Sequence, residues 1–420
     1  MTKYDRERVS DERSDTRIAS LEVNNFDDTY EGDDPTIKEH ELNAAVVTGA
    51  DWTTETILNQ INRENIQLDP KFQRRDAWDR RRKSSFIESL ILGFPIPQIV
   101  LAEDREHRGR FIVLDGKQRL LALKQFAAGS SFDPSDKVTE KGFALFGLKV
   151  LKKLNGESLS DIESDPLKGR LLDSFQNQTI RTVMVRNWPN NDYLNEVFLR
   201  LNTGSVQLSP QELRQALHPG PFTTFLDDFS ASCVPLQQSL GNEGPDFRMR
   251  DVELTLRFFA FDLFLHDYRG NLKAFLDKAT NDLNQLWHIE QDDIIRRAEQ
   301  LSEAIAATNE IFGSDAFRSW SQEKQDFQGR FNRAVFDLMI YYFKDPHIRD
   351  AAIPRSAEVR AAFEYLARSD QIFVDAISST TKTTHAVVNR IGKWGMVLRT
   401  LLPNLDIKVP QLENERIVVV

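Results

Sequence analysis

Five residues in the middle of the chain, DGKQR at positions 115–119, bring together groups that can bind phosphate. They follow the apolar run 111–114 and precede leucines at helical spacing, so we expect them to join a strand to a helix. A glycine at such a junction permits a tight turn and lets the backbone approach a ligand closely. The first N–H groups of the helix lack internal partners and form the positive end of its dipole, so this end suits an anion.

The polar side chains of this stretch add to the expected phosphate site. Gly116 and Lys117 are predicted to bind phosphate, and Gln118 can both donate and accept hydrogen bonds. Asp115 could bind a metal ion, cap the helix or polarise a water molecule. We therefore take Asp115, Gln118 and Arg119 as catalytic candidates and Asp115 as the candidate metal ligand. An Asp-Gly pair that serves only the geometry of the turn remains the alternative.

The Gly-Lys pair is not part of a P-loop. That motif requires a glycine five residues before its second glycine and a Ser or Thr directly after the lysine. The chain has Phe111 and Gln118 at these two positions. A P-loop nucleotide site is therefore excluded here.

The segment KFQRRDAWDRRRK, residues 71–83, has seven Lys or Arg among its thirteen residues. The chain as a whole has a formal net charge of −10, so binding to nucleic acid would have to be local. A solvated helix start is the alternative for the same residues. We expect Trp78 to pack in the core. The candidate DNA-binding residues are Arg75, Arg80, Arg81, Arg82 and Lys83.

The overall composition indicates a soluble globular protein. With 420 residues and 40% apolar content, the chain is long enough for two domains with separate cores. It contains no run of about 18 apolar residues that could span a membrane, and its N-terminus has no apolar segment typical of a secretory signal. A single cysteine, Cys233, excludes a disulfide framework. We therefore expect a cytoplasmic protein without a membrane partner.

Periodicity predicts an α+β domain over residues 46–188 and a mostly helical domain over 189–420, after an acidic, polar and disordered segment 1–45. In the first domain we expect helices over 53–63, 77–94, 117–129 and 167–176. Strands are expected over 95–104, 110–115, 143–151 and 179–185. The helical domain shows helical spacing over 254–268, 331–343 and 387–402. Arg250, Asp251, Glu253 and Arg257 are expected to form ion pairs that stabilise the helical domain.

Several separated motifs resemble one known family. The segments FQRRDAWDRRRKSSFIESLILGFPIPQIVL, FIVLDGKQRLLALKQF and VFLRLNTGSVQLSPQELRQAL are similar to the N-terminal family of GmrSD-type, modification-dependent restriction enzymes. That resemblance implies a ParB/sulfiredoxin-like fold, an Asp-Gly-Gln-Gln-Arg signature, and nucleotide binding or hydrolysis. Lys117 stands where the signature has its first glutamine. Phosphate binding is compatible with this change, whereas hydrolysis is in doubt if that glutamine positions a water molecule.

The resemblance also adds residues to the predicted site. It implies that Gln73 and Arg74 contact phosphate or base, although a solvated basic turn is the alternative. Arg200, Asn202 and Thr203 are expected to complete the nucleotide pocket. Ser209 and Glu212 have the spacing of a capping box, for which we expect a structural role only.

Three functions compete at this point. The first is a bacterial defence protein that binds and hydrolyses an NTP with Mg²⁺ and couples this to sensing DNA or a separate nuclease or defence subunit. The second is a DNA-binding module without catalysis. The third is a metal-dependent DNA nuclease with Asp115 and Glu88 as ligands, although we expect Glu88 to face water. We find no His–Asn–His nuclease motif, and the helical domain could support a homodimer.

Overall fold

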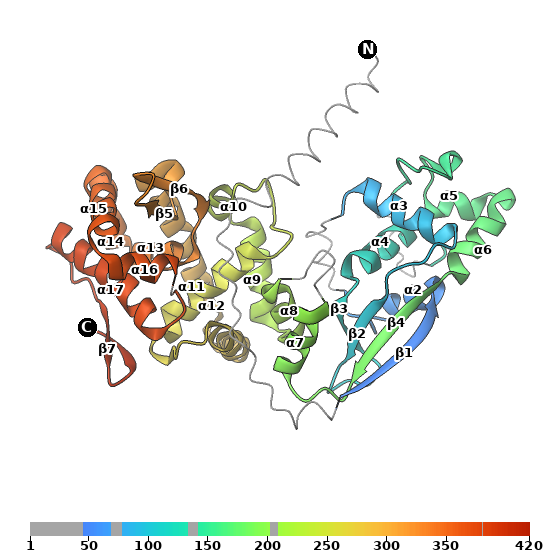
Figure 1. The fold of residues 1–420 in the computed structure, drawn as a ribbon, viewed down its shortest axis with the longest axis horizontal. Coiled ribbons are helices and arrows are strands. Elements are labelled where there is room, and N and C mark those ends of the chain that lie inside the picture. Colours follow the sequence, from blue (N-terminus) through green and yellow to red (C-terminus); the bar gives the residue numbers. More distant parts are fainter. Residues whose placement is uncertain (1–44, 69–77, 133–141, 202–208, 380) are drawn as a thin grey trace, which may run out of the picture. The chain divides into compact units, whose positions relative to one another are not determined.

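The computed structural model describes residues 45–68, 78–132, 142–201, 209–379 and 381–420 (Figure 1). These residues form two compact units. The first contains the described residues up to Pro219 together with 247–249, and the second contains 220–246 and 250–420. The expected boundary lay near residue 188, directly after the last strand. The first unit continues to Pro219 because the next two helices pack against its sheet.

The first unit is built on a mixed four-stranded sheet (Figure 1). The strands lie in the order β1-β4-β2-β3; β2 and β4 are parallel, and the other pairs are antiparallel. Their bounds are β1 Val46–Thr53, β2 Ile99–Glu103, β3 Phe111–Asp115 and β4 Thr179–Arg186. β3 is thus an edge strand, and its carboxyl end carries Asp115.

Helices cover both faces of this sheet, which explains why β2 and β3 are continuous apolar runs. Ile99 and Leu101 of β2 join one core cluster, whereas Val100 and Ala102 join the other. The first cluster includes residues of α2 (Thr54–Asn62), α3 (Arg80–Ile91), α4 (Lys117–Ala127), α5 (Leu159–Ser164) and α6 (Gly169–Asn177). The second includes residues of α7 (Asn191–Leu201) and α8 (Pro210–Leu217).

The structure confirms most of the predicted elements of this unit and corrects one. Residues 143–151 do not form the expected strand; they form a loop that leads into the short 3₁₀ helix η3, Lys152–Leu154. The backbone N–H groups of 149–151 donate to the carboxylate of Glu88 rather than to another strand. Strand β1 was not predicted. The ParB/sulfiredoxin-like fold implied by the family resemblance remains a prediction.

The second unit is mostly helical, as predicted, and centres on one long helix. α12 has 41 residues and contacts α9, α10, α11, α13 and α15. The helices of this unit are α9 Pro221–Ser232, α10 Val234–Leu240, α11 Arg250–Phe264, α12 Leu272–Phe312, α13 Arg333–Phe343, α14 Pro346–Ala352, α15 Ser356–Ser369, α16 Gln371–Ser378 and α17 Thr384–Leu401.

Two hairpins that the sequence did not predict complete the unit. One joins β5 (Arg318–Ser321) to β6 (Asp326–Phe331), and the other joins β7 (Pro410–Glu413) to β8 (Arg416–Val419). Within the described residues, no helix combines the length and the apolar character needed to cross a membrane.

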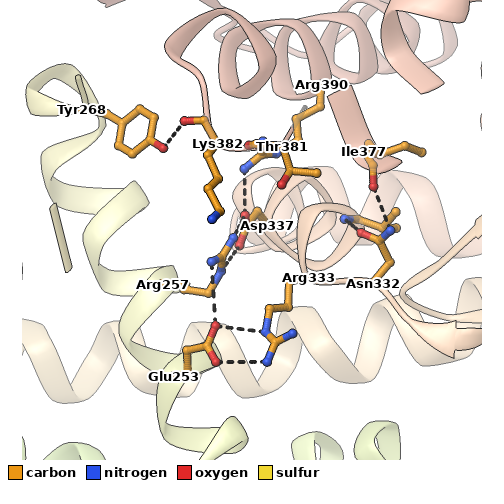
Figure 2. A network of polar contacts seen from close by, with 11 residues as sticks. Glu253, Arg257, Tyr268, Asn332, Arg333, Asp337, Ile377, Thr381, Lys382 and Arg390 are labelled. Carbon is orange, nitrogen blue, oxygen red and sulfur yellow. Dashed lines mark hydrogen bonds and ion pairs between the residues drawn. The ribbon is translucent and has the colours of Figure 1, made fainter. Parts of the chain in front are cut away.

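A buried ion network connects three helices of the second unit (Figure 2). Asp337 of α13 pairs with Arg257 of α11 and, at 2.9 Å, with Arg390 of α17. Glu253 pairs with Arg333 at 3.0 Å and more distantly with Arg257. Glu253 and Arg257 therefore form the expected ion pair, but their closest partners come from helices far along the chain.

Candidate phosphate-binding site

The turn between β3 and α4 requires glycine at position 116. Gly116 has φ of +98°, a left-handed conformation, and α4 begins at Lys117 directly after it. A Cβ atom at this position would lie 3.1 Å from Ile99 Cγ1 and 3.2 Å from Arg119 Nη2. Because Gly116 has no side chain, it provides no side-chain cap for the N–H groups of α4.

Arg119 folds back over this turn and is almost fully buried. Its Nη2 donates to the backbone oxygen of Gln98 at 2.9 Å and to Asp115 Oδ2 at 3.0 Å. Its Nε is also buried, yet it has no hydrogen-bond partner among the residues that the structure describes. This Nε would lie 3.4 Å from a Cβ at Gly116. Gly116 therefore packs closely against a buried donor that has no acceptor in the described part of the chain.

Asp115 is the last residue of β3, and each of its carboxylate oxygens accepts a hydrogen bond. Oδ1 accepts from the N–H of Gly116 at 2.7 Å, and Oδ2 accepts from Arg119. The Asp115 side chain is 21% exposed, whereas that of Arg119 is 9% exposed. Asp115 therefore stabilises the turn and still reaches solvent, as a ligand to an incoming cation must.

Lys117 points to α8 and pairs with Glu212 at 2.5 Å in a buried contact. The other carboxylate oxygen of Glu212 accepts from the N–H of Ser209 at 2.7 Å, and Ser209 Oγ accepts from the N–H of Glu212. The predicted capping box is confirmed. Glu212 was expected to be structural only, but it also holds a candidate phosphate ligand.

The polar side chains of α8 are unusually well buried. Gln211, Glu212, Arg214 and Gln215 are each at most 6% exposed, and Arg214 Nη1 donates to Gln211 Oε1 at 2.6 Å. α8 packs against β3, the strand that leads into the turn. Sequence reasoning missed Gln211, Arg214 and Gln215, because polar side chains on a helix are normally expected to face water.

The remaining predicted site residues divide into two groups. Gln118 is partly buried at the first turn of α4, beside Asp115 and Arg119 in the chain. Arg200, at the end of α7, is largely exposed and pairs with Glu196 at 2.5 Å. The other predicted residues lie outside the described part of the chain: Gln73, Arg74, Arg75, Asn202 and Thr203.

The predicted basic residues of α3 occupy its first turn. Arg80, Arg81 and Arg82 are exposed, and Asp79 caps the helix by accepting from the N–H of Arg82 at 2.6 Å. The Arg82 guanidinium lies 4.9 Å from the centre of the Trp78 ring. Trp78 packs against the core, with its ring 5.7 Å from that of Phe86. The expectation that Trp78 belongs to the core is confirmed.

Glu88 does not face water as expected. It is 5% exposed, and its carboxylate accepts from the N–H groups of Lys149, Val150 and Leu151. Its oxygens are therefore used to hold a loop rather than to share a metal ion with Asp115. Among the described residues, no group of three or more His, Cys, Asp or Glu side chains is arranged to hold a metal ion.

Comparison with known proteins gives one match. Residues 54–219 match the family model described as the N-terminal domain of the GmrSD restriction endonuclease. The matched range includes the sheet from β2 to β4, the β3–α4 turn and α8. No curated protein matches the chain, and no solved structure matches it.

Proposed function

We propose that this protein binds and hydrolyses a nucleoside triphosphate at the β3–α4 turn. Residues 54–219 belong to the family of GmrSD restriction endonuclease N-terminal domains, and the chain is thus a restriction-type defence protein. Gly116, Lys117 and Arg119 would contact the phosphates. Gln73, Arg74, Arg200, Asn202 and Thr203 are proposed to complete the nucleotide pocket.

The buried Nε of Arg119 carries this proposal. A buried donor without an acceptor costs about 1–3 kcal/mol, so it calls for an explanation, of which a ligand oxygen is one. A phosphate oxygen that reaches the turn would supply the missing acceptor, whereas a Cβ at position 116 would crowd Arg119. The start of α4, to which Gly116 provides no side-chain cap, adds the positive end of a helix dipole at the same place.

The charges at the turn indicate which form of the nucleotide would bind. Lys117 and Arg119 carry two positive charges, and their partners Glu212 and Asp115 carry two negative charges. Within the turn, a bare triphosphate would therefore add several negative charges to two ion pairs whose charges already balance. The donor set fits a nucleotide that arrives with Mg²⁺, and Asp115 is the accessible carboxylate that would hold the ion. Bound Mg²⁺ would supply polarisation of the phosphoryl oxygens.

Each side chain of the turn would have a distinct role in hydrolysis. Arg119 is fixed by Gln98 and Asp115, so it can stabilise charge that develops on the transferred phosphoryl group without reorganising. Gln118 would orient the attacking water. Lys117 would neutralise phosphate charge while Glu212 sets its position.

The nucleotide state would be coupled to DNA or to a separate nuclease or defence subunit, in the cytoplasm. A homodimer formed through the helical unit is part of the same proposal. The non-catalytic alternative, a DNA-binding module, is favoured by one observation of its own, the exposed arginines at the start of α3.

Turnover of the four NTPs by the full-length protein with Mg²⁺, with and without DNA, tests the proposal. We expect hydrolysis that Asp115→Ala and Arg119→Ala abolish and that Arg108→Ala, a change at an exposed arginine, leaves intact. Binding without turnover would reject hydrolysis and keep the phosphate site. A folded protein that neither binds nor hydrolyses any NTP would contradict the whole assignment.

A further inference from the structure

Two segments far apart in the sequence form one basic surface on the first unit. The loop 144–153 runs along α3: Phe146 N–H donates to Ser84 Oγ at 2.9 Å, and Arg80 Nε donates to the backbone oxygen of Ala144 at 2.6 Å. Glu88, farther along α3, holds the backbone of 149–151. We call the exposed cations of the two segments the α3 basic surface: Arg80, Arg81, Arg82, Lys149, Lys152 and Lys153.

An aromatic ring organises part of this surface. The guanidinium carbons of Arg80 and Arg81 each lie 5.7 Å from the centre of the Phe146 ring, which is 42% exposed. Gly147 has φ of +71°, and a Cβ there would lie 3.3 Å from Arg81 Nε. The two arginines are therefore held in place before any partner arrives, which lowers the entropy lost on binding.

The α3 basic surface does not serve the stability of the fold. None of its six side chains forms an ion pair with a carboxylate in the described part of the chain, whereas Lys117 and Arg119 are both paired. Three arginines in the first turn of α3 also lie near the positive end of its dipole, which is unfavourable. A cluster that opposes local stability in this way is expected at a functional site.

We propose that the α3 basic surface binds the phosphate backbone of DNA. Unpaired, exposed Lys and Arg from two adjoining segments match a repeated series of phosphates better than a single anion. In a protein of net charge −10, such a contact has to be confined to one region. The new residues are Lys149, Lys152 and Lys153, and they add to the arginines that the sequence indicated. No residue of the β3–α4 turn takes part.

Titration of a short fluorescent DNA duplex with the full-length protein over a series of salt concentrations tests the proposal. The triple variant Lys149→Gln, Lys152→Gln, Lys153→Gln should bind more weakly and lower the slope of log K against log salt by about 1 per lysine, or about 3 in total. The control variant Lys324→Gln, Arg330→Gln, Arg416→Gln changes three exposed cations of the second unit and has the same net charge. It should bind like the unmodified protein.

A second variant and several outcomes of these titrations test the proposal further. Phe146→Ala should also weaken DNA binding, because Arg80 and Arg81 lose the ring that holds them. An unchanged salt slope in the lysine variant, no DNA binding by the unmodified protein, or binding to anionic lipid vesicles instead of DNA would each overturn the proposal. Nucleotide binding by the same lysine variant should persist, so failure here is distinguishable from failure of the NTP site.

Discussion

Lys117 and Glu212 stand 95 residues apart in the chain, and their side chains meet at 2.5 Å in a buried ion pair. The contact joins the first residue of α4 to the capping box of α8. A candidate phosphate ligand is therefore tied to the helix that carries the buried polar residues Gln211, Arg214 and Gln215. Through this pair, any ligand that draws Lys117 toward itself would also act on α8.

Glu212→Gln should destabilise the first unit by about 3–5 kcal/mol, because it leaves the charge of Lys117 buried beside a neutral partner. A glutamine at this position can still accept at the capping box, so the helix cap is retained. Hydrogen exchange of peptides from 99–127 would measure the effect. Glu196→Gln, which changes a surface pair on α7, is the matched control and should have almost no effect. Equal exchange in both variants would show that the buried pair is unimportant.

Gly116→Ala should destabilise the turn more than Gly156→Ala does. Both glycines have a left-handed φ, +98° and +91°, so alanine is strained at either position by about 1–2 kcal/mol. Only at Gly116 does a Cβ also approach its neighbours closely; nothing lies within 4 Å at Gly156. The difference between the melting temperatures of the two variants measures the cost of crowding Ile99 and Arg119 with a Cβ at position 116. Equal melting temperatures would mean that Ile99 and Arg119 move aside freely.

Asp337→Asn should destabilise the second unit by about 3–5 kcal/mol, because Arg257 and Arg390 would lose the buried carboxylate between them (Figure 2). Burial lowers the pKa of Arg390, and the neighbouring Asp337 carboxylate acts against that shift by favouring the charged form. Asp406→Asn removes a carboxylate that is 81% exposed and serves as the control. Denaturant unfolding followed by a probe in the second unit measures both. Equal midpoints for the two variants would contradict the structural role of the network.

Acid should destabilise the second unit partly through Asp246. Burial raises the pKa of this carboxyl, but the pairing with Arg250 at 2.6 Å more than compensates, and the pKa lies below its ordinary value. The stabilisation is therefore complete above the unfolded pKa of about 3.9 and is lost as pH falls through the lower, folded value. Asp246→Asn should be less stable at neutral pH and lose less stability on acidification. A parallel pH dependence in both proteins would exclude this contribution.

Local signals in the sequence were sufficient for most of the first unit. Apolar runs predicted β2 and β3, helical spacing predicted α2, α3 and α4, and the glycine between Asp115 and Lys117 predicted the turn. The apolar residues of 143–151 also suggested a strand. Instead, the backbone N–H groups of 149–151 donate to the buried carboxylate of Glu88. The local sequence pattern does not reveal such a partner.

The contacts that build the candidate site were much less predictable. Ser209 and Glu212 could be assigned to a capping box from their spacing, but the pairing of Glu212 with Lys117 depends on how α8 packs against β3. The lysines of the α3 basic surface lie within or directly after residues 143–151, which were wrongly predicted to form a strand, so their position beside α3 was not foreseen. Long-range packing decides these contacts, and a single sequence does not encode it in any local pattern.

The most direct test of the central claim is equilibrium binding of NTPs to the full-length protein, measured with and without Mg²⁺ for the unmodified chain and for Arg119→Gln. The neutral charge balance of the turn predicts tight binding only with Mg²⁺, and loss of that binding in Arg119→Gln while Arg108→Gln binds normally. Binding that needs no Mg²⁺ would contradict the charge argument. Binding of the same strength in Arg119→Gln would place the nucleotide somewhere other than the β3–α4 turn.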